Sequence, residues 1–309
     1  MERFVFNVTN RCNFKCKMCF RGKSTAADLT CEDVEKVVGL LKRMGVKTIA
    51  LTGGEPILSP RFEEVLKLTV KHGFGVGIVT NGWFYDDYVS LLERYRKDVH
   101  YIALSLDGHT AEVHDAVRRK GSFDRAVRAM EVFRDRGYKL HIGHILNRHN
   151  YPYLTDFCKF VAPHKPVLCL GRVIKTEANG SVQLTGEQES TLHAKIVMLF
   201  RMYKGMIFPT SSIGMSRELL FCTNFLTMED ITLRFDGKVV FCCDSPIEGP
   251  GPVLGDVRRE RIDEIIPRFG RKLGEILSGR IEALAEGKRA TNNNCDFCSR
   301  VLSGLGEAQ

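Results

Sequence analysis

Short apolar runs alternate with amphipathic stretches over the first 172 residues, and this alternation restricts the possible folds more than any other feature. Runs of strand length occupy residues 4–9, 47–52, 75–80, 100–106, 139–146 and 166–171. The intervening segments carry apolar residues at helical spacing, near 34–44, 60–72, 86–96, 122–136 and 151–162. Right-handed βα repeats of this kind curl a parallel sheet towards a barrel or an open twisted sheet. We therefore predict an α/β fold whose functional loops follow the C-terminal ends of the strands.

Three cysteines lie within eight residues of the loop after the first predicted strand: Cys12, Cys16 and Cys19. Three soft ligands on one loop can hold a metal centre, and the missing fourth ligand leaves a coordination position open. A structural zinc site would need a fourth ligand nearby, but the nearest thiol, Cys31, begins a predicted helix and no His precedes His72. The pattern indicates a metal centre that binds something other than protein.

The rest of the composition excludes several classes of protein. Eleven cysteines in 309 residues are an odd number in a chain long enough to build a core without disulfides. The net charge of +8 is spread along the chain without aromatic and basic interleaving, so nucleic acid is an unlikely partner. We find no signal peptide and no apolar run long enough for a membrane span, and therefore expect a cytoplasmic protein with no membrane partner.

Polar or glycine-rich patches follow the next predicted strands as well. Gly53, Gly54 and Glu55 follow the second, Asn81 follows the third, and Ser105 begins the patch after the fourth. Each patch alone is typical of an ordinary turn. Because parallel strands bring their C-terminal ends to one edge, the patches are expected to converge with the cysteine loop on one rim.

Together, the CxxxCxxC loop, the Gly-Gly-Glu-Pro patch and the βα series resemble the radical S-adenosylmethionine (SAM) enzymes. The resemblance implies that Cys12, Cys16 and Cys19 bind a 4Fe-4S cluster whose open iron takes the amino and carboxylate groups of SAM. It also implies reductive cleavage of SAM to a 5'-deoxyadenosyl radical, which removes a hydrogen atom from the substrate. A low-potential electron donor such as flavodoxin or ferredoxin is the expected partner.

The resemblance also assigns roles to individual SAM-binding residues. Glu55, with the backbone of Gly53 and Gly54, would hold the methionyl ammonium group, and Met18 would lie by the adenine. Ser105 and Arg118 match positions that contact the SAM carboxylate or ribose in part of the family. A surface cap and a solvated charge are the ordinary alternatives for these last two residues, and turn or cap roles are the ordinary alternatives for Asn81, Asp107 and Asn150.

The segment after residue 205 differs in character, because it combines a hairpin pattern over 231–241 with Cys222, Cys242, Cys295 and Cys298. It is similar to the twitch domain, a shorter relative of the SPASM extension of radical SAM enzymes. The similarity implies a second, auxiliary 4Fe-4S cluster on these four thiols, with zinc as the alternative. The predicted organisation is a partial (β/α)6 TIM-like barrel over 1–205, followed by a small cysteine-rich α+β twitch domain over 206–309.

Several reactions remain open from the sequence. An auxiliary cluster can accept an electron from a substrate radical, so dehydrogenation of a small-molecule or peptide substrate is the favoured reaction. Epimerisation of a sugar or a peptide Cα is the alternative, with Cys243 as the hydrogen donor; in its ordinary role Cys243 is a small buried residue or another ligand. Peptide thioether crosslinking is a second alternative. A non-catalytic iron-sulfur electron carrier or regulator is the non-enzymatic one.

Overall fold

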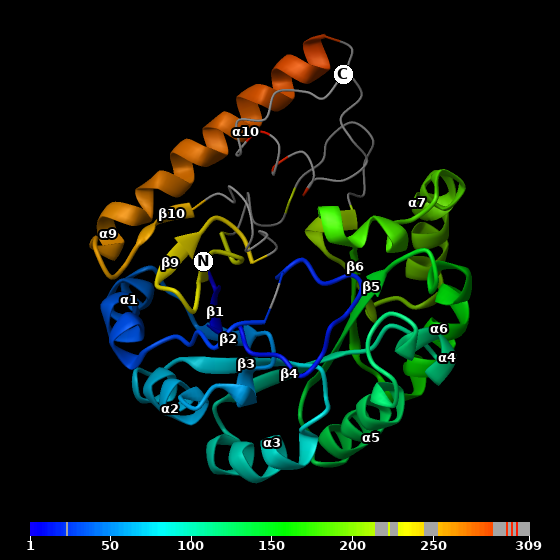
Figure 1. The fold of residues 1–309 in the computed structure, drawn as a ribbon, viewed down its shortest axis with the longest axis horizontal. Helices are drawn as coiled ribbons and strands as arrows, with labels where there is room; N and C mark the ends of the chain where they lie inside the picture. The colour runs from blue at the N-terminus through cyan, green and yellow to red at the C-terminus, as the bar shows by residue number, and fades with distance from the viewer. Residues whose placement is uncertain are drawn as a thin grey trace. The chain divides into compact units, whose positions relative to one another are not determined.

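The computed structural model describes residues 1–22, 24–213, 222, 228–243, 253–286, 295, 298 and 301 (Figure 1). Its strands are β1 (Arg3–Thr9), β2 (Thr48–Gly53), β3 (Gly75–Thr80), β4 (Val99–Ser105), β5 (Leu140–Leu146), β6 (Val167–Arg172), β7 (Ile207–Pro209), β8 (Thr232–Leu233), β9 (Lys238–Val240) and β10 (Val253–Asp256). Its α-helices are α1 (Cys31–Arg43), α2 (Phe62–Lys71), α3 (Tyr85–Leu92), α4 (Ala111–Asp115), α5 (Ser122–Asp135), α6 (Leu154–Val161), α7 (Gly186–Met202), α9 (Ile262–Ile265) and α10 (Pro267–Ala285).

The α/β fold with parallel strands is confirmed. All six strands predicted before residue 172 are present, each within one residue of its predicted ends. The sequence pattern missed α4, β7 and α10, of which the first two are too short to show a period. None of the described helices is both long enough and apolar enough to cross a membrane.

Packing divides the chain into two compact units, which we describe separately. The first unit contains Met1–Arg11, Phe20–Val76 and Ser211–Gln309. The second unit contains Cys12–Cys19 and Gly77–Thr210. The predicted domain boundary between residues 205 and 206 remains a prediction.

The first unit is built around β1. Its strands follow the order β10-β9-β8-β1-β2, with β1 parallel to both β2 and β8. Strand β1 is buried along nearly its whole length, and Phe4 and Phe6 are fully buried, as expected for a parallel strand covered on both faces. Strands β8 and β9 form the predicted antiparallel hairpin, and Gly237 in its turn has a φ of 82° that favours glycine.

An ion pair between the buried Asp33 and the exposed Arg258 links α1 to the C-terminal segment of the first unit. Asp33 completes a capping box with Thr30 at the start of α1, and its carboxylate also accepts two hydrogen bonds from Arg258, at 2.8 and 3.0 Å. Burial alone would raise the pKa of Asp33, but the bonds from Arg258 and Thr30 outweigh it and lower the pKa. The charged pair therefore persists at neutral pH.

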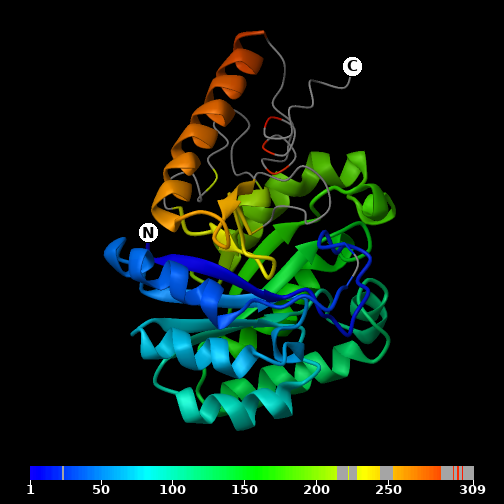
Figure 2. The same cartoon turned by 60° about the vertical axis from the view of Figure 1, so that its left-hand side comes forward.

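The second unit holds the parallel strands β4, β5, β6 and β7 in that order. In Figure 2 the green strands of this unit run side by side, in agreement with the register that pairs Ile102 with Leu140 and His141 with Val167. Helices α5 and α6 contribute the fully buried Phe133 and Phe157 to its core. Strands β4 and β5 therefore lie in a well-packed part of the unit.

Candidate functional site

The cysteine loop leaves β1 at the C-terminal end of the strand. Cys12 and Cys16 are half-buried, Cys19 is exposed, and all three are free thiols. The backbone N–H of Phe14 donates to Cys12 Sγ at 3.4 Å, and that of Cys19 donates to the Cys16 carbonyl at 3.1 Å. The loop is thus folded back on itself, with its last thiol presented to solvent.

Side chains elsewhere in the second unit hold this loop in place. Asn81 Nδ2 donates to Asn13 Oδ1 at 2.8 Å, and Asn81 Oδ1 accepts from the backbone N–H of Trp83 at 2.9 Å. Arg119 donates to the Asn13 carbonyl at 3.1 Å, and its guanidinium lies 4.1 Å from the centre of the Trp83 ring. Asn81 therefore anchors the cysteine loop in addition to making a turn.

Met18 attaches the cysteine loop to the rest of the second unit through apolar contacts. Its side chain is buried and packs with Val117, Val173 and Val182. The neighbouring Lys17 N–H donates to the Val117 carbonyl at 2.8 Å. The contact of Met18 with adenine stays a prediction, but Met18 and its valine neighbours form an apolar surface beside the loop.

The Gly-Gly-Glu segment approaches the end of β1 within the first unit. The N–H of Gly54 donates to the Thr9 carbonyl, and the N–H of Glu55 donates to the Arg11 carbonyl, both at 2.8 Å. A Cβ added to Gly53 would lie 2.4 Å from the Thr9 carbonyl oxygen. Gly53 thus serves a close approach of two backbones immediately before Cys12, and Glu55 is fully buried.

We expect Gly53→Ala to destabilise the fold, because the added Cβ meets backbone that cannot rotate away. The expected loss is about 2–4 kcal/mol in the free energy of unfolding, measured by urea denaturation. Gly186→Ala is the matched control, since a Cβ at Gly186 would meet nothing within 4 Å. Equal stabilities for the two variants would contradict the proposed backbone contact.

Arg118 lies against the cysteine loop in the second unit. Its Nε–H donates to Asp107 Oδ2 at 2.5 Å, and only 10% of its side chain is exposed. Burial raises the pKa of the Cys16 thiol to about 11, and the positive charge of Arg118 partly offsets that rise. A guanidinium this close to a thiol suits an anionic ligand beside the metal centre. Ser105 is half-buried at the end of β4.

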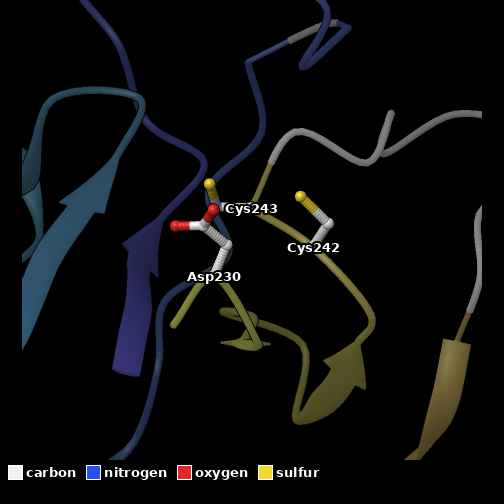
Figure 3. Close-up of side chains that lie close together, drawn as sticks. All are labelled: Asp230, Cys242 and Cys243. Atoms are coloured by element: carbon white, nitrogen blue, oxygen red, sulfur yellow. The ribbon is translucent and has the colours of Figure 1, made fainter. Parts of the chain in front are cut away.

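A second group of metal-binding side chains lies in the first unit, formed by Asp230, Cys242 and Cys243. Their ligand atoms all lie within 4.8 Å of one another. Figure 3 shows Cys243 beside the Asp230 carboxylate and Cys242 on the adjoining turn. A tetrahedral ion with metal–sulfur bonds of about 2.3 Å has ligand atoms roughly 3.8 Å apart. Donors this close suit a single iron or zinc ion, so Cys242 and Cys243 are not arranged to bind two corners of one cluster.

This group sits at the N-terminal end of β1. Arg3, the first residue of the strand, donates to Asp230 Oδ1 at 2.5 Å, and Val5 pairs with Thr232 of β8. The chain leaves β1 for the cysteine loop at the opposite end. Since β1 has seven residues, the two ends are about 20 Å apart at a strand rise of about 3.3 Å.

Two of the remaining predicted ligands, Cys222 and Cys298, lie close to Arg280 of α10. Burial raises the pKa of Cys298 to about 12, with a further rise from the nearby Cys222, whereas Arg280 of α10 opposes it. Cys222 and Arg280 are both buried, and Cys295 is half-buried. The prediction that Cys222, Cys242, Cys295 and Cys298 share one cluster remains a prediction.

Sequence analysis missed Asp230 altogether and treated Asp107 as a turn residue. Asp230 carries no motif, and its only signal is an acidic residue just before an apolar run that precedes two cysteines. Asp107 stands in an Asp-Gly pair, which is usually a turn. In both cases the partners are distant in sequence, so spacing alone did not show them.

Comparison with known proteins adds a family. The model of the radical SAM superfamily matches residues 6–161. Among curated relatives, mycofactocin maturase MftC of Mycobacterium ulcerans is 33% identical over 172 residues, covering 55% of this chain and 46% of that protein. The subtilosin biosynthesis protein AlbA of Bacillus subtilis is 34% identical over 137 residues, covering 43% and 30%. The chain thus spans less than half the length of either relative.

Solved structures agree on the fold. Streptococcus suis SuiB bound to S-adenosylmethionine superimposes with a TM-score of 0.72 at 14% identity, covering 88% of this chain and 68% of that one. SuiB bound to its precursor peptide SuiA gives a TM-score of 0.68 at 14% identity, covering 87% and 65%. At this level of identity the likeness concerns the fold alone.

Proposed function

Because the chain belongs to the radical SAM superfamily, we propose that it is an enzyme that removes two hydrogen atoms from a peptide, with a second metal centre as electron acceptor. Membership makes SAM and a 4Fe-4S cluster its cofactors, and together they supply hydrogen-atom abstraction when bound. Cys12, Cys16 and Cys19 would hold the cluster. The three thiols lie on one loop that Asn81 and Arg119 hold in place through Asn13, and this fits the role.

We assign the binding of SAM to two sets of residues. Gly53, Gly54 and Glu55 would bind its ammonium group, and Ser105 its ribose or carboxylate. Arg118 would bind the carboxylate through its terminal nitrogens, because its Nε–H donates to Asp107. A guanidinium can grip a carboxylate through two parallel hydrogen bonds.

The observation that carries the reaction type is a second set of potential metal ligands in the first unit, Asp230, Cys242 and Cys243, whose ligand atoms lie within 4.8 Å of one another. After the first hydrogen atom has left, loss of the second requires the transfer of one electron and one proton. We assign the electron to an auxiliary centre held by Cys222, Cys242, Cys295 and Cys298, and the proton to solvent or a base of the substrate pocket.

A peptide substrate is supported by the relatives. They include a maturase and a protein solved with a precursor peptide. A small-molecule substrate is the competing possibility. Neither the non-enzymatic electron carrier nor the regulator needs the SAM-binding segment around Gly53, and this favours an enzyme.

Epimerisation is the second candidate, because Cys243 follows the proposed ligand Cys242 directly and its thiol could donate a hydrogen atom. Its Sγ, however, is grouped with Cys242 and Asp230, an arrangement more typical of a metal environment than of a free hydrogen donor. Dehydrogenation is therefore the function that we favour.

The test incubates the anaerobically reconstituted enzyme with SAM, a reductant and candidate peptides encoded near its gene, in deuterated solvent. We expect a product lighter by two hydrogens, one 5'-deoxyadenosine per product and no solvent deuterium on carbon. The Cys243→Ala variant should give the same product. Epimerisation would instead give a product that has not lost two hydrogens and that carries one solvent deuterium in place of a hydrogen on carbon. If that product forms, and the Cys243→Ala variant does not make it, the reaction is epimerisation and not dehydrogenation.

Thioether crosslinking also removes two hydrogens, so the product is treated with iodoacetamide. A dehydrogenated peptide keeps every alkylatable thiol of the substrate. Loss of one such thiol would identify a crosslink and overturn simple dehydrogenation.

A further inference from the structure

Asp107 is a buried residue with several hydrogen-bond partners at the carboxyl ends of β4 and β5 in the second unit. Its side chain is fully buried, with Oδ2 bonded to Arg118 and Oδ1 accepting from the Ile145 N–H at 2.6 Å. Its own N–H donates to His114 Nδ1 at 3.0 Å, and its carbonyl accepts from Asn150 Nδ2 at 3.1 Å. A turn residue would not need a buried carboxylate with two hydrogen-bond partners and a backbone bonded to two further side chains.

The charge of Asp107 is matched by Arg118 and by no other cation in contact with it among the described residues. Burial is the largest single influence on Asp107 and would raise its pKa, but the charge of Arg118, together with smaller contributions from His144, His114 and the Ile145 N–H, outweighs it and the pKa is lowered. His144 Nδ1 faces the Leu106 carbonyl at 3.0 Å and must therefore carry a proton there. Burial lowers the pKa of both histidines, so they are neutral near pH 7.

Arg118 is held at one end only. Its Nε–H points at Asp107, and no described residue accepts a hydrogen bond from its two terminal nitrogens. The guanidinium also lies close enough to Cys16 and Cys19 for each to raise the pKa of Arg118. The free fork of the guanidinium is thus available on the side of the cysteine loop.

We propose that Asp107 is a positioning residue for SAM, which locks the Arg118 guanidinium through Nε so that its terminal nitrogens meet the carboxylate of SAM. This inference rests on the proposed role of Arg118 as the carboxylate ligand. Asp107 itself does not touch SAM. Because the pair is buried and rigidly bonded, the geometry of the fork is set before the ligand arrives.

The test measures SAM affinity in a double-mutant cycle with Asp107→Asn, Arg118→Gln and the combined variant. Affinity is read from the change that SAM causes in the electron paramagnetic resonance spectrum of the reduced cluster, so turnover is not required. We expect Asp107→Asn to weaken SAM about tenfold to a hundredfold, the effect of a misplaced charge-assisted hydrogen bond. In the Arg118→Gln background it should have no further effect, because the group that it positions is gone.

Two other variants keep the result interpretable. Asp115→Asn removes a nearby carboxylate that caps α5 through Gly121 and Phe123 and does not contact Arg118, so SAM affinity should stay at the wild-type value. Asp107→Glu keeps the charge but moves the carboxylate by one methylene, so it should also weaken SAM binding. It provides the test if the Asn variant fails to fold.

The outcomes separate the two proposals. Unchanged affinity in Arg118→Gln would show that Arg118 does not bind SAM, which overturns the proposed ligand role and the positioning role with it. Normal affinity in both Asp107 variants, with a weakened Arg118→Gln, would overturn the positioning role alone. Equal losses from Asp107→Asn in both backgrounds would also overturn it, because the effect would not pass through Arg118.

Discussion

Changing Cys12, Cys16 and Cys19 together to Ala is expected to abolish SAM cleavage while leaving about four irons on the protein. The three thiols are the only protein ligands proposed for the SAM-binding cluster, and without that cluster no electron reaches SAM. We expect formation of 5'-deoxyadenosine to fall by at least about 10³-fold, a modest part of the acceleration that enzymes supply. The iron that remains belongs to the proposed auxiliary cluster on Cys222, Cys242, Cys295 and Cys298, which the substitutions do not touch.

The measurements are iron and zinc content by elemental analysis, and 5'-deoxyadenosine by chromatography after reduction with SAM. Cys31→Ala is the matched control, since this half-buried thiol starts α1 and lies beside Glu64, away from both metal groups. It should retain about eight irons and full SAM cleavage. A triple variant that holds zinc and no iron would contradict the auxiliary cluster, and one that still cleaves SAM would contradict the proposed site.

Local pattern was sufficient for most of the fold. Strand β1 is a run of buried apolar residues, and α1 has a capping box at one end and Gly45 with a φ of 75° at the other, all of which depend on neighbours in sequence. The rule that parallel strands present their carboxyl ends on one edge then located the cysteine loop and the Gly53 segment. These predictions needed no knowledge of tertiary contacts.

The parts that escaped prediction depend on long-range pairing. Asp230 lies beside β1 because a two-residue strand, β8, pairs with Val5 and Phe6, and two residues are too few to show a period. Asp107 reaches Ile145, which lies 38 residues away, and Asn13 reaches Asn81, which lies 68 residues away. Turn statistics describe only neighbours in the chain, so a buried carboxylate and an ordinary Asp-Gly turn look alike in sequence.

His114 belongs to the buried hydrogen-bond network around Asp107, and it should make the stability of the protein sensitive to acid. The ring is fully buried, and its Nδ1 accepts from the Asp107 N–H, whereas its Nε2 has no partner among the described residues. Burial, helped by the charge of Arg118, lowers the pKa of His114 to about 4. An unfolded histidine titrates near 6.5, so between these two pH values the unfolded chain binds a proton that the folded chain rejects.

Stability therefore falls as the pH drops through this window, and it is fully present above about pH 6.5. From the pKa difference, His114 alone should remove about 2 kcal/mol of unfolding free energy between pH 7 and pH 5, and about 3 kcal/mol by pH 4. His114→Asn keeps an acceptor for the Asp107 N–H and cannot take up the proton. It should be less stable than wild type at pH 7 because of the lost ring packing, yet lose about 2 kcal/mol less on going to pH 5.

Urea denaturation of wild type and variant across pH 5–7 measures this difference, in a range where other buried groups affect both proteins equally. His193→Asn is the control, because His193 is exposed on α7 and its loss should leave the pH dependence parallel to wild type. If His114→Asn also runs parallel, the proton uptake belongs to another group. If its slope is flatter, the proton uptake belongs to His114, and the neutral histidine is part of what isolates the Asp107–Arg118 pair.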